Sequence, residues 1–330
     1  MNGVLIIDKP AGFTSHDVVN RVRRILGERS VGHLGTLDPM ATGVLPLVIG
    51  NLTRLAQFYT KAEKVYEGAI RFGFATDTYD AEGKAVGKPQ EIELHAAEIE
   101  ALAAHFRGVI QQTPPPFSAK KIQGVPAYKL ARKEKEVALK PVQVEIKEFE
   151  ILAVEGNCLH FRARVASGTY LRSVAHDMGQ RLGCGAHLSS LRRTAVAEFT
   201  LADAHTLEEI AELVKQCHPD LSLPFPQGKE DGVEGPGGEG SGLAVTSNVA
   251  DLFIHPRKLL PELPSVTVDD LTAARIRSGR AVNLPDLSRA HQIKVFEGQK
   301  NLLAIATRIA GTLFHPKIVL CGADTLVRRL

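Results

Sequence analysis

The stretch Val31-Gly32-His33-Leu34-Gly35-Thr36-Leu37-Asp38-Pro39-Met40-Ala41-Thr42-Gly43-Val44-Leu45-Pro46 carries more information than any other part of the sequence. The proline after Asp38 keeps this aspartate out of the helical region, and Gly43 closes the loop before an apolar strand predicted over Val44–Ile49. A carboxylate that a loop presents beside a strand suits catalysis, although an isolated Asp-Pro most often only starts a turn. The glycines do not form a phosphate-binding P-loop, because no Gly-Lys-Ser/Thr follows them.

Regular elements are expected on both sides of this loop, which is itself predicted to run from Ser30 to Gly43 without a strand. Upstream, Gly3–Ile7 is an apolar strand, and Ser15 is expected to cap a helix over Asp17–Leu26. Downstream, the periodicity predicts four helices: Leu52–Thr60, His95–Phe106, Tyr170–Leu182, and one that a capping box at Thr206–Glu209 opens and that runs to Gln216. The predicted strands are Tyr66–Phe72, Val142–Val154, Leu159–Val165 and Ser189–Thr200.

Length and composition limit the class of protein. At 330 residues the chain is long enough for about two domains, each with its own core. With 44% hydrophobic and 23% charged residues, it has the composition of a soluble globular protein. Its longest apolar runs fall short of the ~18 residues that cross a bilayer, and its N-terminus lacks the features of a secretory signal. We therefore expect a cytoplasmic protein without a membrane partner.

The cysteines and the net charge do not indicate a metal or a polyanionic partner. Cys158, Cys184, Cys217 and Cys321 are widely spaced, without a C-x-x-C pair, so neither disulfides nor a zinc site is expected. Cys184 and His187 stand at ligand spacing, but no second pair accompanies them. The net charge of +3 is too small to indicate a nucleic-acid partner by itself.

The charge distribution is more informative than the net charge. Ser118–Lys140 follows a stiff run of three prolines and is the densest basic stretch of the chain, although such a run is more often only a solvated surface. Between Gly228 and Gly242, seven glycines and four acidic residues accompany almost no apolar side chains. This composition indicates a linker or a disordered insertion, and it puts in doubt a fixed orientation of the following domain.

The last part of the chain, Leu263–Leu330, is predicted to form a small β-rich domain. Its short β-like runs are Ile293–Phe296, Asn301–Thr307 and Lys317–Leu320, and one helix is expected over Asp270–Ser278.

Several blocks of the sequence together resemble one known family. Gly32–Pro39, with Ala41–Leu45, closely resembles the catalytic motif of the bacterial tRNA pseudouridine-55 synthases, the TruB family. Blocks similar to others of that family follow in order: Gly3–Gly12 with Thr14–Asp17, Lys64–Tyr66, Pro115–Lys121, Gly168–Arg172 and Leu191–Arg193. The resemblance covers about residues 3–216, and its breadth outweighs the interpretation of Asp38 as a plain turn residue.

The resemblance implies a fold and a reaction. The implied fold is an α+β catalytic domain on a mixed, largely antiparallel sheet over residues 1–216, with a basic RNA-clamping insertion at about 111–140. A Gly/Glu-rich linker at 217–262 and a small PUA-like β-barrel that binds RNA at 263–330 complete the expected organisation. The implied reaction converts uridine to pseudouridine at position 55 in the T-loop of tRNA: the N1–C1′ bond breaks, the uracil rotates, and C5 bonds to C1′.

The resemblance also assigns catalytic roles. Asp38 matches the catalytic aspartate, a carboxylate that acts at the sugar as nucleophile or base. Arg172 matches an arginine that pairs with this aspartate, and we expect it to lower the pKa of Asp38. Tyr66 matches a tyrosine whose ring stacks on the uracil and whose hydroxyl takes part in removal of the C5 proton. For Arg172 a surface ion pair, and for Tyr66 core packing, are the alternatives.

Four further residues match positions around the substrate. A stacked uridine must be flipped out of the RNA before its sugar can be reached, and His33 matches the residue that helps to occupy the vacated space. Tyr170 and Leu191 match positions that line the uracil pocket, although both suit a plain core equally well. Lys9 matches a motif lysine that either supports the site or contacts phosphate.

The implied partner is tRNA, through its T-arm, with the acceptor stem as a contact of the C-terminal domain. Lys120, Lys121 and Arg132 of the insertion are expected to neutralise phosphates of the T-arm. No cofactor, metal or obligate protein partner is expected, because the reaction needs neither redox chemistry nor nucleotide hydrolysis.

Two other functions stay open. A guide-RNA-dependent pseudouridine synthase of the related dyskerin type shares the chemistry, but the basic insertion and the lack of lysine-rich tails speak against it. An RNA-binding protein or tRNA-folding chaperone would not need the set of Asp38, Tyr66 and Arg172, although assistance with folding can coexist with catalysis.

Overall fold

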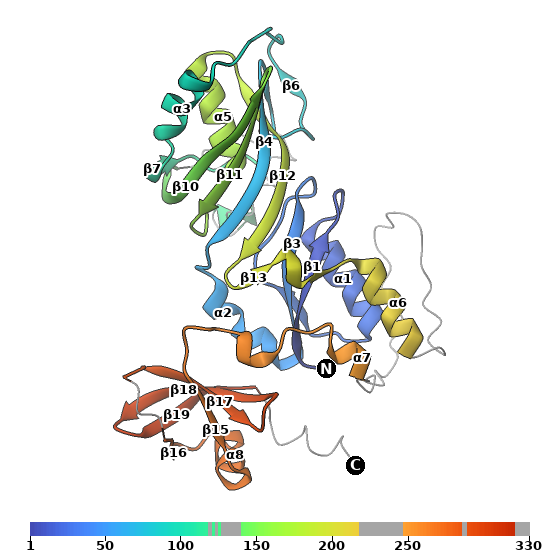
Figure 1. Ribbon diagram of the computed structural model, residues 1–330, viewed down its shortest axis with the longest axis vertical. Helices are drawn as coiled ribbons and strands as arrows, with labels where there is room; N and C mark the ends of the chain where they lie inside the picture. The colour runs from blue at the N-terminus through green and yellow to red at the C-terminus, as the bar shows by residue number, and fades with distance from the viewer. Residues whose placement is uncertain (118–120, 123–124, 127–139, 218–246, 286–288, 321–330) are drawn as a thin grey trace.

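A ten-stranded mixed sheet forms the larger part of the protein (Figure 1). The computed structural model describes residues 1–117, 121–122, 125–126, 140–217, 247–285 and 289–320. The strands of this sheet are β1 (Gly3–Lys9), β2 (Val31–His33), β3 (Thr42–Ile49), β4 (Lys64–Phe72), β7 (Gly108–Gln112), β10 (Val142–Glu155), β11 (Cys158–Val165), β12 (Ala186–Val196), β13 (Phe199–Thr200) and β14 (Ala204–His205).

The order of the strands is β14-β1-β3-β12-β4-β11-β10-β7, with β2 paired to β3 and β13 paired to β12. The pairs β1–β14 and β3–β12 are parallel, and the other pairs in this sheet are antiparallel. The expected α+β fold on a mixed, largely antiparallel sheet is thus confirmed. The parallel pairing of β3 with β12 matters most for the site. It places the strand that follows the Asp38 loop next to β12, and β12 in turn pairs with β4.

Helices cover one face of the sheet in two groups. Near the N-terminus α1 (Ser15–Leu26) packs beside α6 (Leu207–Cys217), and at the other end lie α3 (Ala96–Ala104) and α5 (Leu171–Leu182) (Figure 1). The alternation along β1 separates two cores: Leu5 and Ile7 join the cluster under these helices, whereas Val4 and Ile6 join a cluster on the opposite face. Burial on both faces explains why Gly3–Ile7 of β1 is an unbroken apolar run.

The helix α5 packs unusually close to β12. A Cβ atom on Gly179 would lie 2.1 Å from the backbone nitrogen of Ala186, so only glycine permits this contact. The helix then ends at Gly183, which adopts a left-handed conformation with φ of 73° as its C-cap. The C-terminal end of α5 is therefore held closely against β12, and the first turn of the same helix carries Arg172.

A second, curled sheet of five strands forms the C-terminal domain. Its order is β15-β17-β18-β19-β16, and its shape is that of a half-barrel consistent with the expected PUA-like domain. Its elements are β15 (Ser265–Val268), α8 (Asp270–Arg277), β16 (Val282–Asn283), β17 (Gln292–Glu297), β18 (Asn301–Ala310) and β19 (Leu313–Val319). The predicted β-like runs fall in β17, β18 and β19, except that Leu320 lies one residue beyond β19.

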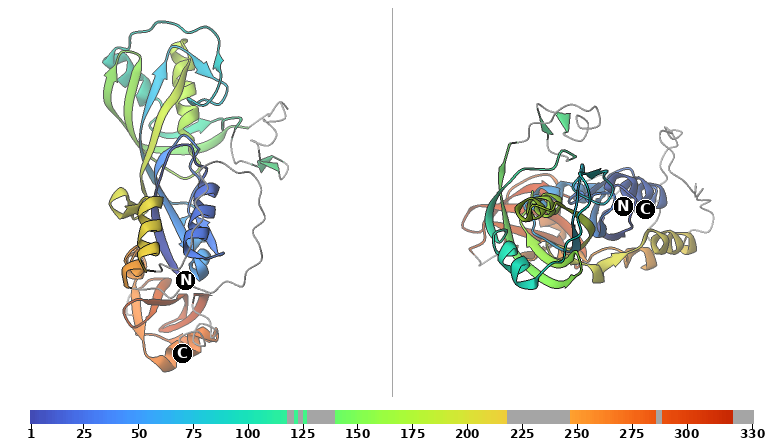
Figure 2. Two further views of the ribbon diagram at one scale, coloured as in Figure 1. Left: turned by 90° about the vertical axis from the view of Figure 1, so that its right-hand side faces the viewer. Right: turned by 90° about the horizontal axis from the view of Figure 1, so that it is seen from above.

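The two sheets share one apolar cluster. Leu55, Tyr59 and Phe199 of the large domain belong to it together with Phe296 and Ile318 of the C-terminal sheet. Both views in which the long axis is vertical show the C-terminal sheet directly below the N-terminal half of the large sheet (Figures 1 and 2). The expectation that the orientation of the C-terminal domain is unfixed is therefore wrong, because composition alone does not show buried contacts between domains.

The later half of the expected linker at 217–262 is packed against the large domain. Val249 and Leu252 are 2% and 3% exposed and lie in its core, and Phe253 forms an isolated bridge with Leu5 of β1. The backbone N–H of Leu260 donates to Glu198 Oε1 (2.9 Å), which also accepts from the Tyr59 hydroxyl (2.7 Å). The segment Gly228–Gly242 lies outside the described residues, and the division into domains stays a prediction.

Three predicted elements differ from the structure. The loop Ser30–Gly43 contains β2, a three-residue strand too short to show alternation. The helix predicted over Leu52–Thr60 is a 3₁₀-helix at Gly50–Leu55 followed by one turn of α2 (Ala56–Tyr59), since the Ala56 N–H donates to Thr53 O, three residues back. The strand predicted over Ser189–Thr200 begins at Ala186, ends at Val196 and turns at Ala197, with φ of 50°, into β13.

The remaining short elements are β5 (Ala75–Thr76), β6 (Ala85–Val86), β8 (Lys121–Ile122), β9 (Val125–Pro126), α7 (Ser247–Ala250) and two further 3₁₀ turns, Leu201–Asp203 and Pro256–Lys258. Within the described ranges, no helix combines the length and the hydrophobicity that a membrane span requires.

Candidate active site

The loop between β2 and β3 presents Asp38, and a serine holds its centre. The Ser15 hydroxyl accepts from the Leu37 N–H (2.8 Å) and donates to Leu37 O (3.1 Å). The expectation that Ser15 caps α1 is wrong: Thr14 is the N-cap and forms a capping box with Asp17. Thr14 has the extended backbone that a cap requires, which leaves the buried Ser15 hydroxyl available for the loop.

Two buried cations hold the loop on either side of Asp38. From β12, the Arg193 guanidinium donates to Gly35 O (3.0 Å), Thr36 O (3.2 Å) and Val44 O (2.8 Å). At the end of β1, the Lys9 ammonium donates to Pro39 O (3.1 Å), Pro10 O (2.8 Å) and Phe13 O (2.7 Å). Each cation satisfies several carbonyls that the irregular loop would otherwise leave without donors.

The environment of Lys9 favours a supporting role over contact with phosphate. Its side chain is fully buried, and all three of its hydrogen bonds go to backbone oxygens. Burial lowers the pKa of Lys9 to about 8, against the raising effect of Asp38. At neutral pH the ammonium is still mainly protonated and keeps three donors for its three carbonyls.

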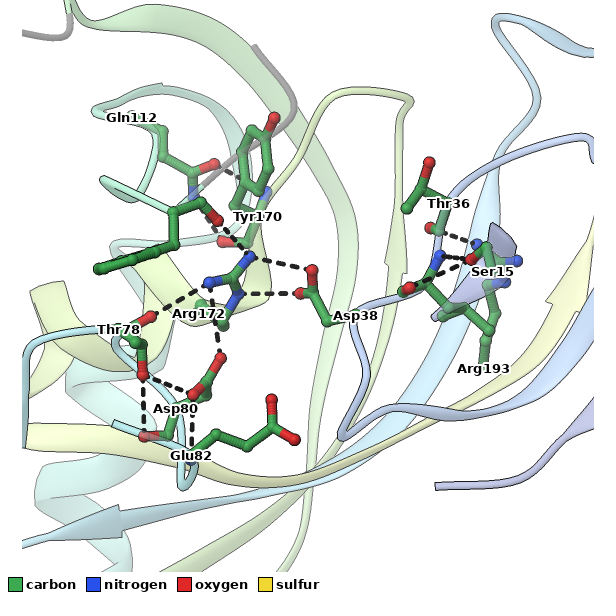
Figure 3. Close-up of polar contacts among 12 residues, drawn as sticks. Ser15, Thr36, Asp38, Thr78, Asp80, Glu82, Gln112, Tyr170, Arg172 and Arg193 are labelled. Carbon is green, nitrogen blue, oxygen red and sulfur yellow. Dashed lines mark hydrogen bonds and ion pairs between the residues drawn. The ribbon is translucent and has the colours of Figure 1, made fainter. Parts of the chain in front are cut away.

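Arg172, the second residue of α5, contacts both carboxylate oxygens of Asp38 with one edge of its guanidinium (Figure 3). Its Nε lies 2.9 Å from Asp38 Oδ2, and its Nη2 donates to Asp38 Oδ1 at 3.0 Å. Arg172 is 5% exposed. Its Nη2 also donates to Phe117 O (2.9 Å), and its Nη1 donates to Thr78 O (3.2 Å) and lies 3.5 Å from the Asp80 carboxylate. Such a two-point contact fixes the direction of a carboxylate as well as its charge.

The pKa of the Asp38 carboxyl is raised, although its pairing with Arg172 was expected to lower it. Burial raises it above its ordinary value, and the nearby Asp80 adds to this rise, whereas Arg172 and Lys9 lower it. The lowering expected from Arg172 is present but does not outweigh burial. The ionised state of Asp38 therefore depends on its arginine.

Asp80 is a site residue that the sequence analysis missed. It is 3% exposed, and its Oδ1 accepts from the Thr78 hydroxyl (2.6 Å) and the Glu82 N–H (3.1 Å). Figure 3 shows Arg172 between Asp38 on one side and the Thr78–Asp80 segment on the other. Burial, then Asp80 and Asp38, raise the pKa of the Glu82 carboxyl. Thr-x-Asp spacing is too common to have marked this segment.

The three expected pocket residues lie on different elements. Tyr66 of β4 is 9% exposed, lies beside Arg193 in the strand register and belongs to the apolar core. Tyr170 is the residue before α5, and the Gln112 amide binds its backbone N–H (2.8 Å) and carbonyl (3.0 Å). Leu191 lies on β12 opposite Gly68 of β4. The buried Gln112 is a further positioning residue that the sequence did not indicate.

His33 lies in β2 at the start of the loop. Its Nδ1 accepts from the Gly35 N–H (3.3 Å), which leaves the proton on Nε2. Burial lowers the pKa of His33, and the charge of Arg193 and the nearby His16 add to this effect. The imidazole is thus neutral at pH 7, which suits a residue that contacts bases more than one that binds phosphate.

An open groove of about 550 Å³ lies next to the loop. Its lining includes residues on either side of the loop, among them Gly12, Met40, Thr42, Glu82 and Leu191. Asp38, Tyr66 and Arg172 are not part of that lining, so the groove adjoins the site and is not centred on it.

The residues expected to contact phosphates lie largely outside the described part. Lys120 and Arg132 are not among the described residues. Lys121 begins β8, which pairs with β9, and its side chain is not described.

No metal-binding cluster of three or more His, Cys, Asp or Glu side chains occurs in the described ranges. Cys184 and His187, which stand at ligand spacing in the sequence, each contact a backbone oxygen: Gly185 O at 3.4 Å and Phe74 O at 3.1 Å.

Two family models and several full-length relatives match this chain. The N-terminal domain of the TruB family pseudouridylate synthases matches residues 23–171, and the tRNA pseudouridylate synthase B C-terminal domain matches residues 172–222. The tRNA pseudouridine synthase B of Solibacter usitatus is 45% identical over 97% of this chain and 100% of its own length. That of Aquifex aeolicus is 47% identical over the same shares, 97% and 100%.

A solved structure of a Cbf5-Nop10-Gar1 complex contains a chain with the same fold. Its TM-score is 0.67 at 24% identity, over 98% of this chain and 86% of that one. The relatives and the family match together establish the classification: the chain belongs to the TruB family of pseudouridylate synthases, which are isomerases.

Proposed function

We propose that this protein converts uridine to pseudouridine at position 55 in the T-loop of tRNA. The names of its full-length relatives, tRNA pseudouridine synthase B, support tRNA as the substrate. The main observation in support of the proposal is the Asp38–Arg172 pair, in which a buried guanidinium contacts both oxygens of a loop carboxylate. The Asp38 side chain is 36% exposed, and Met40, two residues further on, lines an open groove, so a nucleotide can approach the carboxylate.

The reaction requires access to the sugar of a stacked nucleotide. Flipping the uridine out of the loop costs a few kcal/mol, which new contacts in the site repay. Asp38 then acts at C1′ while the N1–C1′ bond breaks and positive charge develops on the sugar. After rotation C5 bonds to C1′, the proton on C5 leaves, and N1 gains a proton, so the product is an isomer of the substrate.

Arg172 keeps the nucleophile ready for this step. Burial raises the pKa of Asp38, and a protonated carboxyl could not act at C1′. The positive charge of the guanidinium and its hydrogen bond both lower the pKa of Asp38 and so favour the ionised carboxylate. Its anchors on Thr78 O and Phe117 O prevent it from following Asp38 if the carboxylate moves.

The other expected residues complete the proposal. Tyr66 stacks on the uracil and assists in removal of the C5 proton, and Tyr170 and Leu191 form the walls of the uracil pocket. The neutral His33 helps to fill the space that the flipped base leaves. Lys120, Lys121 and Arg132 contact phosphates of the T-arm, which makes affinity dependent on salt. A tRNA substrate accords with a cytoplasmic location.

The test is pseudouridine mapping on an unmodified tRNA transcript with the purified protein alone. We expect product at the T-loop uridine without metal, nucleotide or guide RNA. The Asp38→Asn variant should give no product and bind tRNA as the wild type does, since the change keeps the shape and removes the charge. Asp251→Asn, an exposed aspartate far along the chain, is the matched control.

Three outcomes would contradict the proposal. Turnover by Asp38→Asn would remove Asp38 from its role. Product at another uridine would refute the assigned position. Tight binding of tRNA without product would favour a guide-dependent synthase or a binding protein.

A further inference from the structure

Tyr79, in the segment that contacts Arg172, has a strained backbone. Its φ is 66°, in the left-handed region that glycine tolerates and that side chains with a Cβ rarely adopt. Its N–H donates to Thr76 O (3.3 Å), and its carbonyl accepts from the Leu188 N–H of β12 (3.0 Å). An outlier of this kind persists only where the surroundings stabilise it.

The ring of Tyr79 stacks on His176 of α5. The ring centroids are 3.8 Å apart and the planes differ by 12°. His176 Nδ1 is buried, and within the described part of the chain it has no hydrogen-bond partner. Burial lowers the pKa of His176, so the imidazole is neutral at pH 7. The contact between Tyr79 and the imidazole is therefore a ring stack between two neutral groups.

This stack joins the two elements that meet at Arg172. His176 lies one turn after Arg172 on α5, and Tyr79 lies between Thr78 and Asp80. Thr78 O accepts from Arg172 Nη1 (3.2 Å), and the Asp80 carboxylate lies 3.5 Å from the same nitrogen. A shift of Tyr79 would move both groups away from the guanidinium.

We propose that Tyr79 is a positioning residue for the isomerisation. Its stack on His176 compensates for the strained backbone and holds Thr78 O and Asp80 against Arg172. Arg172 in turn aims Asp38 at the sugar. This inference rests on the catalytic role proposed for Asp38.

Hydrogen bonds within the segment are the competing explanation. The Thr76 hydroxyl donates to Asp80 O (2.7 Å), and the Thr78 hydroxyl donates to Asp80 Oδ1 (2.6 Å). If these bonds alone fix the segment, the ring of Tyr79 is dispensable. A second alternative is that the half-buried ring contacts RNA, which would affect binding and not the chemical step.

The test compares variants that keep or remove the stack. Tyr79→Leu keeps the Cβ and its backbone strain but loses the ring pair, and we expect kcat to fall about tenfold, with KM for tRNA within about twofold of wild type. Tyr79→Phe keeps the ring and should retain most of kcat. The double variant Tyr79→Leu/His176→Ala should be no slower than the slower single variant, because both remove one interaction.

The pH profile separates positioning from general damage. Asp38 is faced by Arg172, Asp80, Lys9 and Glu82. A less well-placed Arg172 lowers the pKa of Asp38 less, so the acid limb of kcat against pH should move to higher pH in Tyr79→Leu but not in Tyr79→Phe. A merely loosened fold would reduce kcat without moving this limb.

Several results would overturn the inference: wild-type kcat in Tyr79→Leu, a raised KM with unchanged kcat, or additive losses in the double variant. If circular dichroism shows that Tyr79→Leu does not fold, His176→Ala and His176→Phe test the stack from the other side. Only His176→Phe keeps an aromatic partner for Tyr79, so kcat should fall in His176→Ala and be largely retained in His176→Phe. Wild type and Asp38→Asn run in the same assay. Inactive wild type or active Asp38→Asn contradicts the proposed function itself, whereas failure of the Tyr79 variants alone contradicts only the positioning role.

Discussion

Replacing Arg193 with methionine tests whether a buried guanidinium holds the Asp38 loop in place. Arg193 has no exposed surface, and it donates to three carbonyls, two of them at Gly35 and Thr36, shortly before the turn at Asp38 and Pro39. Methionine has a similar reach without any donor. We expect lower stability together with lower kcat, because the same bonds maintain the loop and the parallel contact of β3 with β12.

The magnitude follows from the contacts. Each hydrogen bond from a charged donor is worth roughly 1.5–3 kcal/mol, so three lost bonds would exceed 4 kcal/mol in isolation. Methionine also escapes the cost of burying a cation, which is several kcal/mol. The net loss of unfolding free energy is then about 3 kcal/mol.

Urea unfolding followed by circular dichroism measures this loss, provided that the slope with urea is unchanged. Arg192→Met is the matched control, since the neighbouring side chain on the opposite face is 42% exposed and pairs with Asp8 at 2.7 Å. An exposed pair of this kind contributes at most about 1 kcal/mol. Equal losses in the two variants, or wild-type stability in Arg193→Met, would refute the reasoning.

Further predictions concern three other side chains. Arg172→Gln removes the group that lowers the pKa of Asp38, so the acid limb of kcat/KM should move to higher pH; an unmoved limb in a pH series would contradict this. For Lys9→Met, the fall in pKa from 10.5 to about 8 implies a burial cost of about 3 kcal/mol, which offsets much of the loss of its hydrogen bonds. The free energy of unfolding should therefore change by less than about 2 kcal/mol while kcat falls. A larger decrease of this free energy in urea unfolding would show that Lys9 mainly stabilises the fold. Phe199→Ala should cost about 3–5 kcal/mol and lower the melting temperature of both domains together; calorimetry that shows only one domain affected would contradict the shared core.

Long periodic elements were predictable from the sequence, since their signal is local. The strands β4, β10 and β11 and the helices α5 and α6 begin and end within a few residues of their predicted bounds. The loop carboxylate Asp38 and its partner Arg172 were also identified, from motifs, and the structure brings them into direct contact.

The supports of the site were not predictable, because they depend on strand alternation and on backbone oxygens distant in sequence. Arg192 and Arg193 look alike in the sequence, yet on β12 the side chain of Arg192 points toward solvent and that of Arg193 is buried. The buried Arg193 donates a hydrogen bond to Val44 O, which lies 149 residues away in the sequence. Carbonyl acceptors leave no trace in side-chain patterns. The same holds for Gln112, whose side-chain amide binds the backbone of Tyr170.

The apolar cluster between the two sheets also limits how the chain can be divided. A fragment that ends near Cys217 would expose Leu55, Tyr59 and Phe199 to water as one contiguous patch. The C-terminal sheet alone would expose Phe296 and Ile318 in the same way. Each half therefore covers an apolar surface of the other, and a fragment with only one half would expose its side of this cluster to water.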